Sequence, residues 1–142
     1  MQTYRFGKFS VEIDEKSTQD WYKNADGWNC PCAQCKNFIE LAKKKVLPSF
    51  VMEPLGKLQI PPEKPTYLCE IYDNEEGYHY HFSYRIAGNI LEKEVDPAAT
   101  NEWIDKIECY HEIYPYGAPG FPTPHFDLVF YVTLPWILDY YV

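Results

Sequence analysis

The sequence lacks any hydrophobic run that approaches a membrane span. A membrane-spanning helix needs roughly 18 or more consecutive apolar residues, and polar residues interrupt every apolar stretch of this chain. The N-terminal residues alternate between polar and aromatic side chains, whereas a secretory signal needs an apolar core. We therefore expect a cytoplasmic protein that does not associate with a membrane.

Positive charge is also scarce. The chain has 13 Lys and Arg residues against 21 Asp and Glu residues, which gives a formal net charge of −8. Proteins bind nucleic acid largely by neutralising phosphates with Lys and Arg side chains. A nucleic-acid partner is therefore not expected.

Recognisable catalytic motifs are missing as well. The sequence contains no phosphate-binding loop, no dinucleotide fingerprint and no serine-hydrolase signature. Glu108 and Glu112 can supply carboxylates for acid–base chemistry, but a spacing of four residues along a strand holds them too far apart to act directly together. The sequence therefore favours a non-enzymatic protein.

The composition is that of a globular domain. At 142 residues, 46% hydrophobic and 24% charged, the chain has the length and balance of one domain that covers residues 1–142. Aromatic residues reach 18%, with 13 tyrosines, and tyrosine is typical of half-buried strands and of interfaces.

The hydrophobic periodicity divides the chain in two. After a predicted hairpin over Tyr4–Ile13, the N-terminal half has helical periodicity, with helices that begin near Ser17, Cys32 and Ser49. From residue 66 the period becomes 2, which predicts strands over Tyr67–Ile71, Tyr78–Ile86, Ile107–Ile113 and His125–Leu134.

Two details refine this pattern. Pro54 predicts a short or broken third helix, because proline cannot donate a helical hydrogen bond. Gly88-Asn89 predicts the end of one strand, with a further short strand over Ile90–Val95.

These segments predict the fold class. The strands are joined by turns and loops that are too short for helical crossovers, which favours antiparallel pairing. We expect an α+β fold: an antiparallel sheet of about five to six strands, with two or three helices from the N-terminal half packed on one face.

A cysteine cluster is the strongest candidate site. Cys30, Cys32 and Cys35 fall within six residues at the start of a predicted helix. Thiolates at this spacing can converge on one zinc ion, and a structural site needs a fourth ligand, for which Cys69 and Cys109 are the candidates. The sequence as a whole predicts no cofactor, and zinc is the one that this cluster could hold.

Two alternatives remain open for these thiols. A helix N-terminus lowers the pKa of a cysteine, which suits thiol redox chemistry, but a redox motif of this kind follows a buried strand. Alternatively the cysteines only pack, since cysteine is often a buried small hydrophobe and Cys35 lies on the apolar stripe of its helix.

Other residues suggest binding. His79 and His81 share one face of a predicted strand and form a second, weaker metal candidate. Tyr114, Tyr116 and Phe121 lie in a loop rich in Pro and Gly, and Trp136 follows the last strand. Large aromatic side chains beside prolines suit an interaction surface for a partner protein. The function that we expect is therefore that of a non-enzymatic domain that binds a partner protein, and the alternative is a metal-binding or thiol-redox protein that uses the cysteine cluster.

Three motifs carry a resemblance to a known family. They are Phe6-Gly7-Lys8-Phe9-Ser10-Val11-Glu12-Ile13-Asp14, then Thr18 with Trp21-Tyr22, and Cys30-x-Cys32-x-x-Cys35-x-Asn37-Phe38. Together with the linker Leu58–Pro65, in which Gln59 and Pro61 replace more usual Gly and Asp, the chain resembles an uncharacterised bacterial domain family over most of its length. The resemblance implies no activity. It implies that the cysteine element belongs to a recurring domain.

Overall fold

The computed structural model describes residues 1–95 and 105–139, so the expected domain of residues 1–142 extends beyond the described part at residues 96–104 and 140–142. The described part contains three helices, none of them long and apolar enough to cross a membrane. The elements in chain order are β1 (Gln2–Phe6), β2 (Phe9–Ile13), α1 (Glu15–Asn24), α2 (Ala33–Lys43), α3 (Ser49–Leu58), β3 (Tyr67–Asn74), β4 (Gly77–Lys93), β5 (Lys106–Tyr110) and β6 (His125–Leu134).

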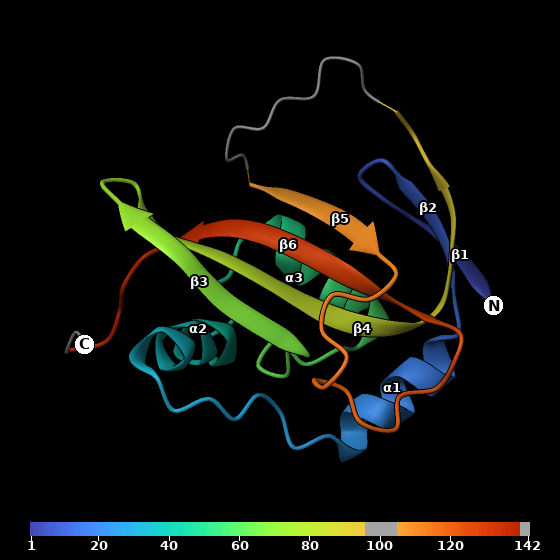
Figure 1. The fold of residues 1–142 in the computed structure, drawn as a ribbon, viewed down its shortest axis with the longest axis horizontal. Helices are drawn as coiled ribbons and strands as arrows, with labels where there is room; N and C mark the ends of the chain where they lie inside the picture. Colours follow the sequence, from blue (N-terminus) through green and yellow to red (C-terminus); the bar gives the residue numbers. More distant parts are fainter. Residues whose placement is uncertain (96–104, 140–142) are drawn as a thin grey trace.

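The strands form one antiparallel sheet of six strands (Figure 1). Its order is β1-β2-β4-β6-β5, and β3 pairs with β4 beside this path. Every pairing is antiparallel. The predicted α+β class is confirmed, and so is the hairpin, in which Gly7 adopts the positive φ of +56° that a tight turn needs.

Strand β4 is longer than predicted. It runs for 17 residues through Gly88 and Asn89, so the expected break there is wrong. Gly88 has φ +148°, and a Cβ on it would lie 2.0 Å from the carbonyl oxygen of Glu12. Because glycine has no side chain, β2 can approach β4 closely at this position. Gly88 therefore permits close pairing instead of ending the strand.

The helices begin and end at identifiable signals. Asp14 caps α1, because its Oδ1 accepts a hydrogen bond from the backbone N–H of Ser17 at 3.1 Å. Helix α3 continues through Pro54, contrary to the expected break, and ends at Gln59 in the left-handed conformation. Pro54 lies in the second turn and is buried, so its packing contacts offset the cost of the hydrogen bond that proline cannot donate.

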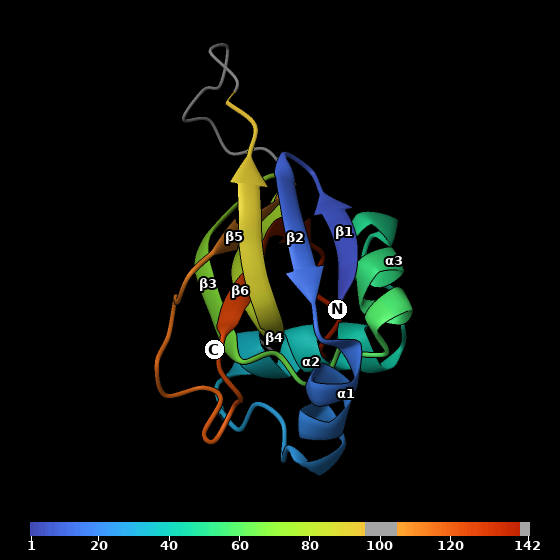
Figure 2. The same cartoon turned by 90° about the vertical axis from the view of Figure 1, so that its right-hand side faces the viewer.

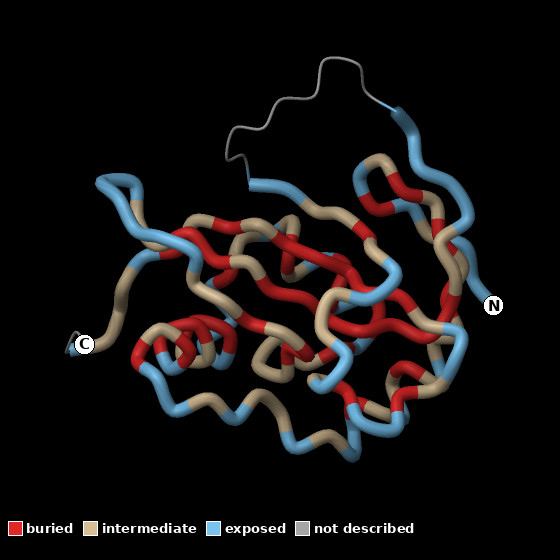
Figure 3. Tube along the Cα trace, in the orientation of Figure 1, coloured by how far each residue is buried: buried red, intermediate tan, exposed pale blue. Residues whose placement is uncertain are grey.

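In Figure 1 helix α3 lies behind the sheet and helix α2 lies below β3, and Figure 2 shows both from the side. The core lies between these helices and the inward side chains of β4 and β6, among them Tyr80, Phe82, Tyr84 and Phe130, all fully buried. Figure 3 shows the same concentration of buried residues along the two central strands. Aromatic rings therefore fill much of the interior.

The opposite face of the sheet carries a buried ion pair. Arg85 on β4 and Asp127 on β6 are directly paired in register, and their side chains are 3% and 1% exposed. The Nε and Nη2 atoms of Arg85 donate to the two carboxylate oxygens at 2.8 and 3.0 Å. The same two side chains bond the backbone of Ile113 and Tyr114, so they hold the loop after β5 against the sheet.

We predict that Asp127→Asn destabilises the protein by about 3–5 kcal/mol, because it removes the buried counter-charge of the Arg85 guanidinium and leaves it only the half-exposed carboxylate of Glu112, 3.5 Å away. Urea denaturation followed by circular dichroism measures the change. The exposed pair between Lys16 and Asp20 provides the control, since Asp20→Asn should leave the midpoint unchanged. An Asp127→Asn protein as stable as the Asp20→Asn protein would contradict the prediction.

Candidate metal centre

The cysteine cluster lies at the N-terminus of α2. Cys32 is the N-cap, with an extended backbone (φ −66°, ψ 156°), and its Sγ accepts a hydrogen bond from the backbone N–H of Cys35 at 3.4 Å. A serine or aspartate oxygen usually has this capping role.

The three sulfur atoms converge. The Sγ atoms of Cys30, Cys32 and Cys35 all lie within 4.8 Å of one another, and those of Cys30 and Cys32 are 3.3 Å apart. All three cysteines are free. Zn–S bonds of 2.3 Å in a tetrahedron place sulfurs about 3.8 Å apart. The observed spacing therefore allows all three sulfurs to bind one metal ion.

The surroundings of the sulfurs differ. Hydrogen bonds with the backbone and side chain of Cys32 lower the pKa of Cys30. Burial raises the pKa of the Cys35 thiol, although the indole N–H of Trp28 donates to its Sγ at 3.4 Å. Cys32 is exposed and Cys30 is half-buried, so the group is accessible from solvent at one side and packed against the core at the other.

The helix that carries the cluster is anchored by polar contacts. The hydroxyl of Tyr80 on β4 donates to the carbonyl of Gln34 at 2.7 Å. The buried amide of Asn37 donates to the carbonyl of Pro135 at 3.0 Å and accepts from the N–H of Ile137 at 2.8 Å. Asn37 thus ties α2 to the segment after β6, which gives a structural role to the asparagine of the cysteine motif.

The two distant cysteines do not join the cluster. Cys69 pairs with His81 in the sheet, and its Sγ lies 3.5 Å from the carbonyl oxygen of Glu70. Cys109 is buried opposite Leu128, where burial raises its pKa to about 12. Among residues 1–95 and 105–139, the group of metal-ligating atoms contains the three clustered cysteines and no fourth member.

The two histidines that the sequence suggested as a second metal site, His79 and His81, have different neighbours. His79 lies 3.0 Å from Oδ1 of Asn74 and 2.9 Å from the hydroxyl of Thr133, whereas His81 stacks on Tyr131 with ring centroids 4.6 Å apart. Their ligand atoms are in no metal-sized group within the described residues.

Glu108 and Glu112 also have different partners. Glu108 accepts a hydrogen bond from the Tyr110 hydroxyl at 2.7 Å, and Glu112 lies 3.5 Å from Arg85. The two carboxylates therefore contact different residues and do not form a pair that acts on one substrate.

The four residues expected to form an interaction surface do not lie together on one surface. Tyr116 is 80% exposed and Tyr114 is half-buried. Phe121 is 8% exposed and packs on Trp21, so its expected place on the surface is wrong. Trp136 packs on Tyr78, with ring centroids 4.9 Å apart. The segment that follows β6 and the loop between β5 and β6 lie at opposite ends of the sheet (Figure 1).

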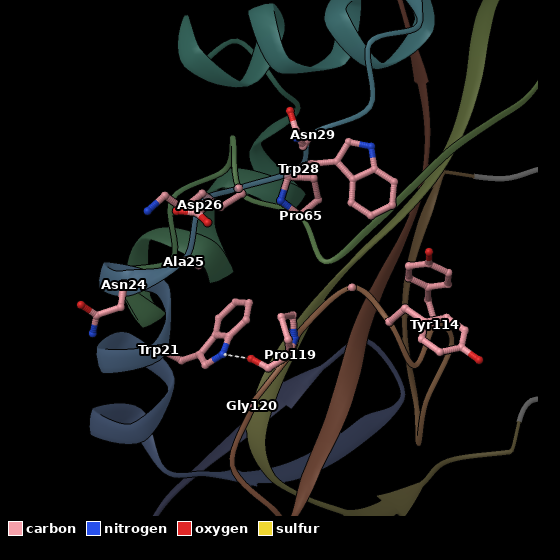
Figure 4. Close-up of a pocket in the computed structure, with 14 residues that line it drawn as sticks. Trp21, Asn24, Ala25, Asp26, Trp28, Asn29, Pro65, Tyr114, Pro119 and Gly120 are labelled. Carbon is pink, nitrogen blue, oxygen red and sulfur yellow. Dashed lines mark hydrogen bonds between the residues drawn. The ribbon is translucent and has the colours of Figure 1, made fainter.

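A cavity was not predicted from the sequence. It encloses about 610 Å³ and is lined by residues that include Trp21, Asp26, Trp28, Lys64, Tyr114 and Tyr116 (Figure 4). Two of the tyrosines proposed as an interaction surface belong to it. Trp28 connects it to the cysteines, because its N–H group bonds Cys35 while its side chain lines the cavity.

Comparison with known proteins adds no assignment. No protein-family model matches the chain, and neither a curated protein nor a solved structure matches it significantly. The resemblance to an uncharacterised bacterial domain family stays an expectation.

We predict that an alkylating reagent labels Cys30 faster than Cys35 and Cys109 in folded, metal-free protein. The thiolate is the reactive form. A lowered pKa raises the thiolate fraction of Cys30, and burial lowers that fraction for the other two cysteines. Iodoacetamide labelling at a pH of about 8, followed by peptide mass mapping, measures the rates. Unfolding in urea should remove the difference, and equal rates in the folded protein would contradict the prediction.

Proposed function

We propose that this chain binds a zinc ion through Cys30, Cys32 and Cys35. The observation that carries the proposal is the convergence of three free sulfurs within 4.8 Å at the start of α2. Thiolates are preferred ligands for zinc. A cation among the sulfurs also offsets the cost of ionising Cys35, whose burial otherwise favours the protonated thiol.

Thiol redox chemistry is less well supported. The residues from Ala25 to Pro31 form no strand, and the sheet is antiparallel, so the strand–helix context of a thioredoxin-like motif is missing in this part of the chain. Packing alone accounts for Cys35 and in part for Cys30, which lies against the core, but it does not account for Cys32, whose thiol is exposed.

Three protein ligands leave one position of a tetrahedral ion. The group is accessible at Cys32, so a water molecule or a donor atom from another protein can take the fourth position. A side chain of a partner protein in this position agrees with the expected role as a non-enzymatic interaction domain. The metal would then both stabilise the start of α2 and provide a contact for the partner.

We expect protein purified without added metal to contain about one equivalent of zinc, because three preorganised thiolates bind it tightly. Elemental analysis measures the content. Cys30→Ser and Cys32→Ser should each lower it, since serine is a poor zinc ligand. Cys69→Ser is the matched control, because Cys69 is a free, half-buried cysteine outside the group.

Two outcomes would contradict this proposal. One is a zinc or iron content below about 0.2 equivalents that added zinc does not raise. The other is a Cys69→Ser protein that loses as much metal as the Cys32→Ser protein. Thermal unfolding of all four proteins shows whether a variant has lost metal because it has lost its fold.

A further inference from the structure

The cavity beside the cysteines has the dimensions of a ligand site. Its volume of about 610 Å³ lies within the range of roughly 300–1,000 Å³ that small-molecule sites occupy. Three separate segments line it: the end of α1 with the residues that follow, Lys64-Pro65, and the loop that includes Tyr114 and Gly120 (Figure 4).

The aromatic walls of the cavity are fixed in place. The indole N–H of Trp21 donates to the carbonyl of Pro119 at 3.1 Å, and that of Trp28 donates to Cys35. Trp28 also packs edge-on against Tyr114, with ring centroids 6.1 Å apart. Because both indole donors are already bonded, these two side chains offer a ligand mainly their carbon surfaces.

The loop wall is equally constrained. Arg85 bonds the carbonyl of Tyr114 at 3.1 Å from beneath the loop. A Cβ on Gly117 would lie 1.7 Å from the carbonyl oxygen of Thr66, so the loop lies directly against the start of β3. A preorganised wall lowers the entropy cost of binding.

The polar groups of the cavity balance in charge. Asp26 and Lys64 are the charged side chains among the described lining residues, and their formal charges cancel. Lys64 also donates to the carbonyl of Tyr22 at 2.8 Å. The amides of Asn24 and Asn29 add both donors and acceptors. A neutral ligand with several hydroxyl groups fits this set better than an anion or a cation.

From this arrangement we infer that the cavity binds a neutral carbohydrate. Aromatic rings have a negative face, which attracts the slightly positive C–H groups of a sugar ring, and amides and a carboxylate at the rim bond its hydroxyl groups. Proline-rich peptides also dock in aromatic-lined grooves, but proline has no N–H donor, so such a peptide would leave the carboxylate and amide oxygens of the lining without donors.

The test uses the whole chain and three neutral oligosaccharides: cellotetraose, maltotetraose and tri-N-acetylchitotriose. Calorimetry and the intrinsic fluorescence of the tryptophans should show saturable one-to-one binding of at least one of them. Tyr116→Ala should weaken that binding about fivefold to tenfold, since it removes one aromatic contact. Tyr116 is 80% exposed, so its replacement should not unfold the protein.

Trp136→Ala is the matched control, because Trp136 is a partly buried aromatic residue outside the cavity. It should leave sugar binding unchanged. Asp26→Ala should weaken binding through the loss of hydrogen bonds alone, since Asp26 is exposed. A decaproline peptide and inorganic phosphate should bind more weakly than the best sugar.

Three results would overturn the inference. The first is no binding of any of the three sugars up to about 10 mM. The second is sugar binding that Tyr116→Ala and Asp26→Ala leave unchanged, which would place the ligand elsewhere. The third is tighter binding of decaproline or phosphate than of every sugar, which would assign the cavity to a different class of ligand.

Discussion

The pairing of β4 with three other strands is the constraint on which this structure depends. Its first half lies between β3 and β6, and its second half pairs with β2. Because one continuous backbone makes all these hydrogen bonds, the hairpin at the N-terminus and the strands of the C-terminal half share one sheet. The close approach at Gly88 permits this, since any side chain there would collide with the backbone of Glu12. Every other element is placed relative to this strand.

The two faces of β4 position the two candidate sites. On one face Tyr80 and Phe82 pack beneath α2, and the hydroxyl of Tyr80 bonds the first turn of that helix near Cys35. On the other face Arg85, with Asp127, holds the loop that carries Tyr114. The cysteine cluster and one wall of the cavity are therefore supported by neighbouring residues of the same strand.

Trp28 links the two sites in space. Its N–H group bonds a sulfur of the cluster, and its ring contacts Tyr67 and Tyr114 beside the cavity. The segment from Ala25 to Pro31 has no regular structure, so contacts of this kind determine its course. The two sites differ in charge: the proposed metal site depends on ionised thiols, whereas the cavity holds one acid and one base whose formal charges cancel.

Local pattern was sufficient for much of the fold and for the cysteine cluster. Periodicity predicted the hairpin, the helices and the alternating strands, because side-chain direction follows the backbone repeat. Three cysteines within six residues are close in any compact conformation, so their proximity was also predictable. The course of β4 through Gly88 was not predictable from the sequence. A glycine can form a turn or can allow a close approach between strands, and which of the two occurs depends on the neighbouring strand.

Only the tertiary structure decided which distant residues meet. Cys69 and Cys109 remained outside the cluster because strand register, which spacing does not reveal, directs each to a different neighbour. The cavity likewise depends on a long-range contact: the indole of Trp21 bonds the carbonyl of Pro119, and the two residues are 98 positions apart in the sequence. The sequence by itself determined the local elements and the cluster of thiols, whose contacts are short in sequence. The cavity and the missing fourth ligand depend on long-range packing, which follows from how all the strands pair at once.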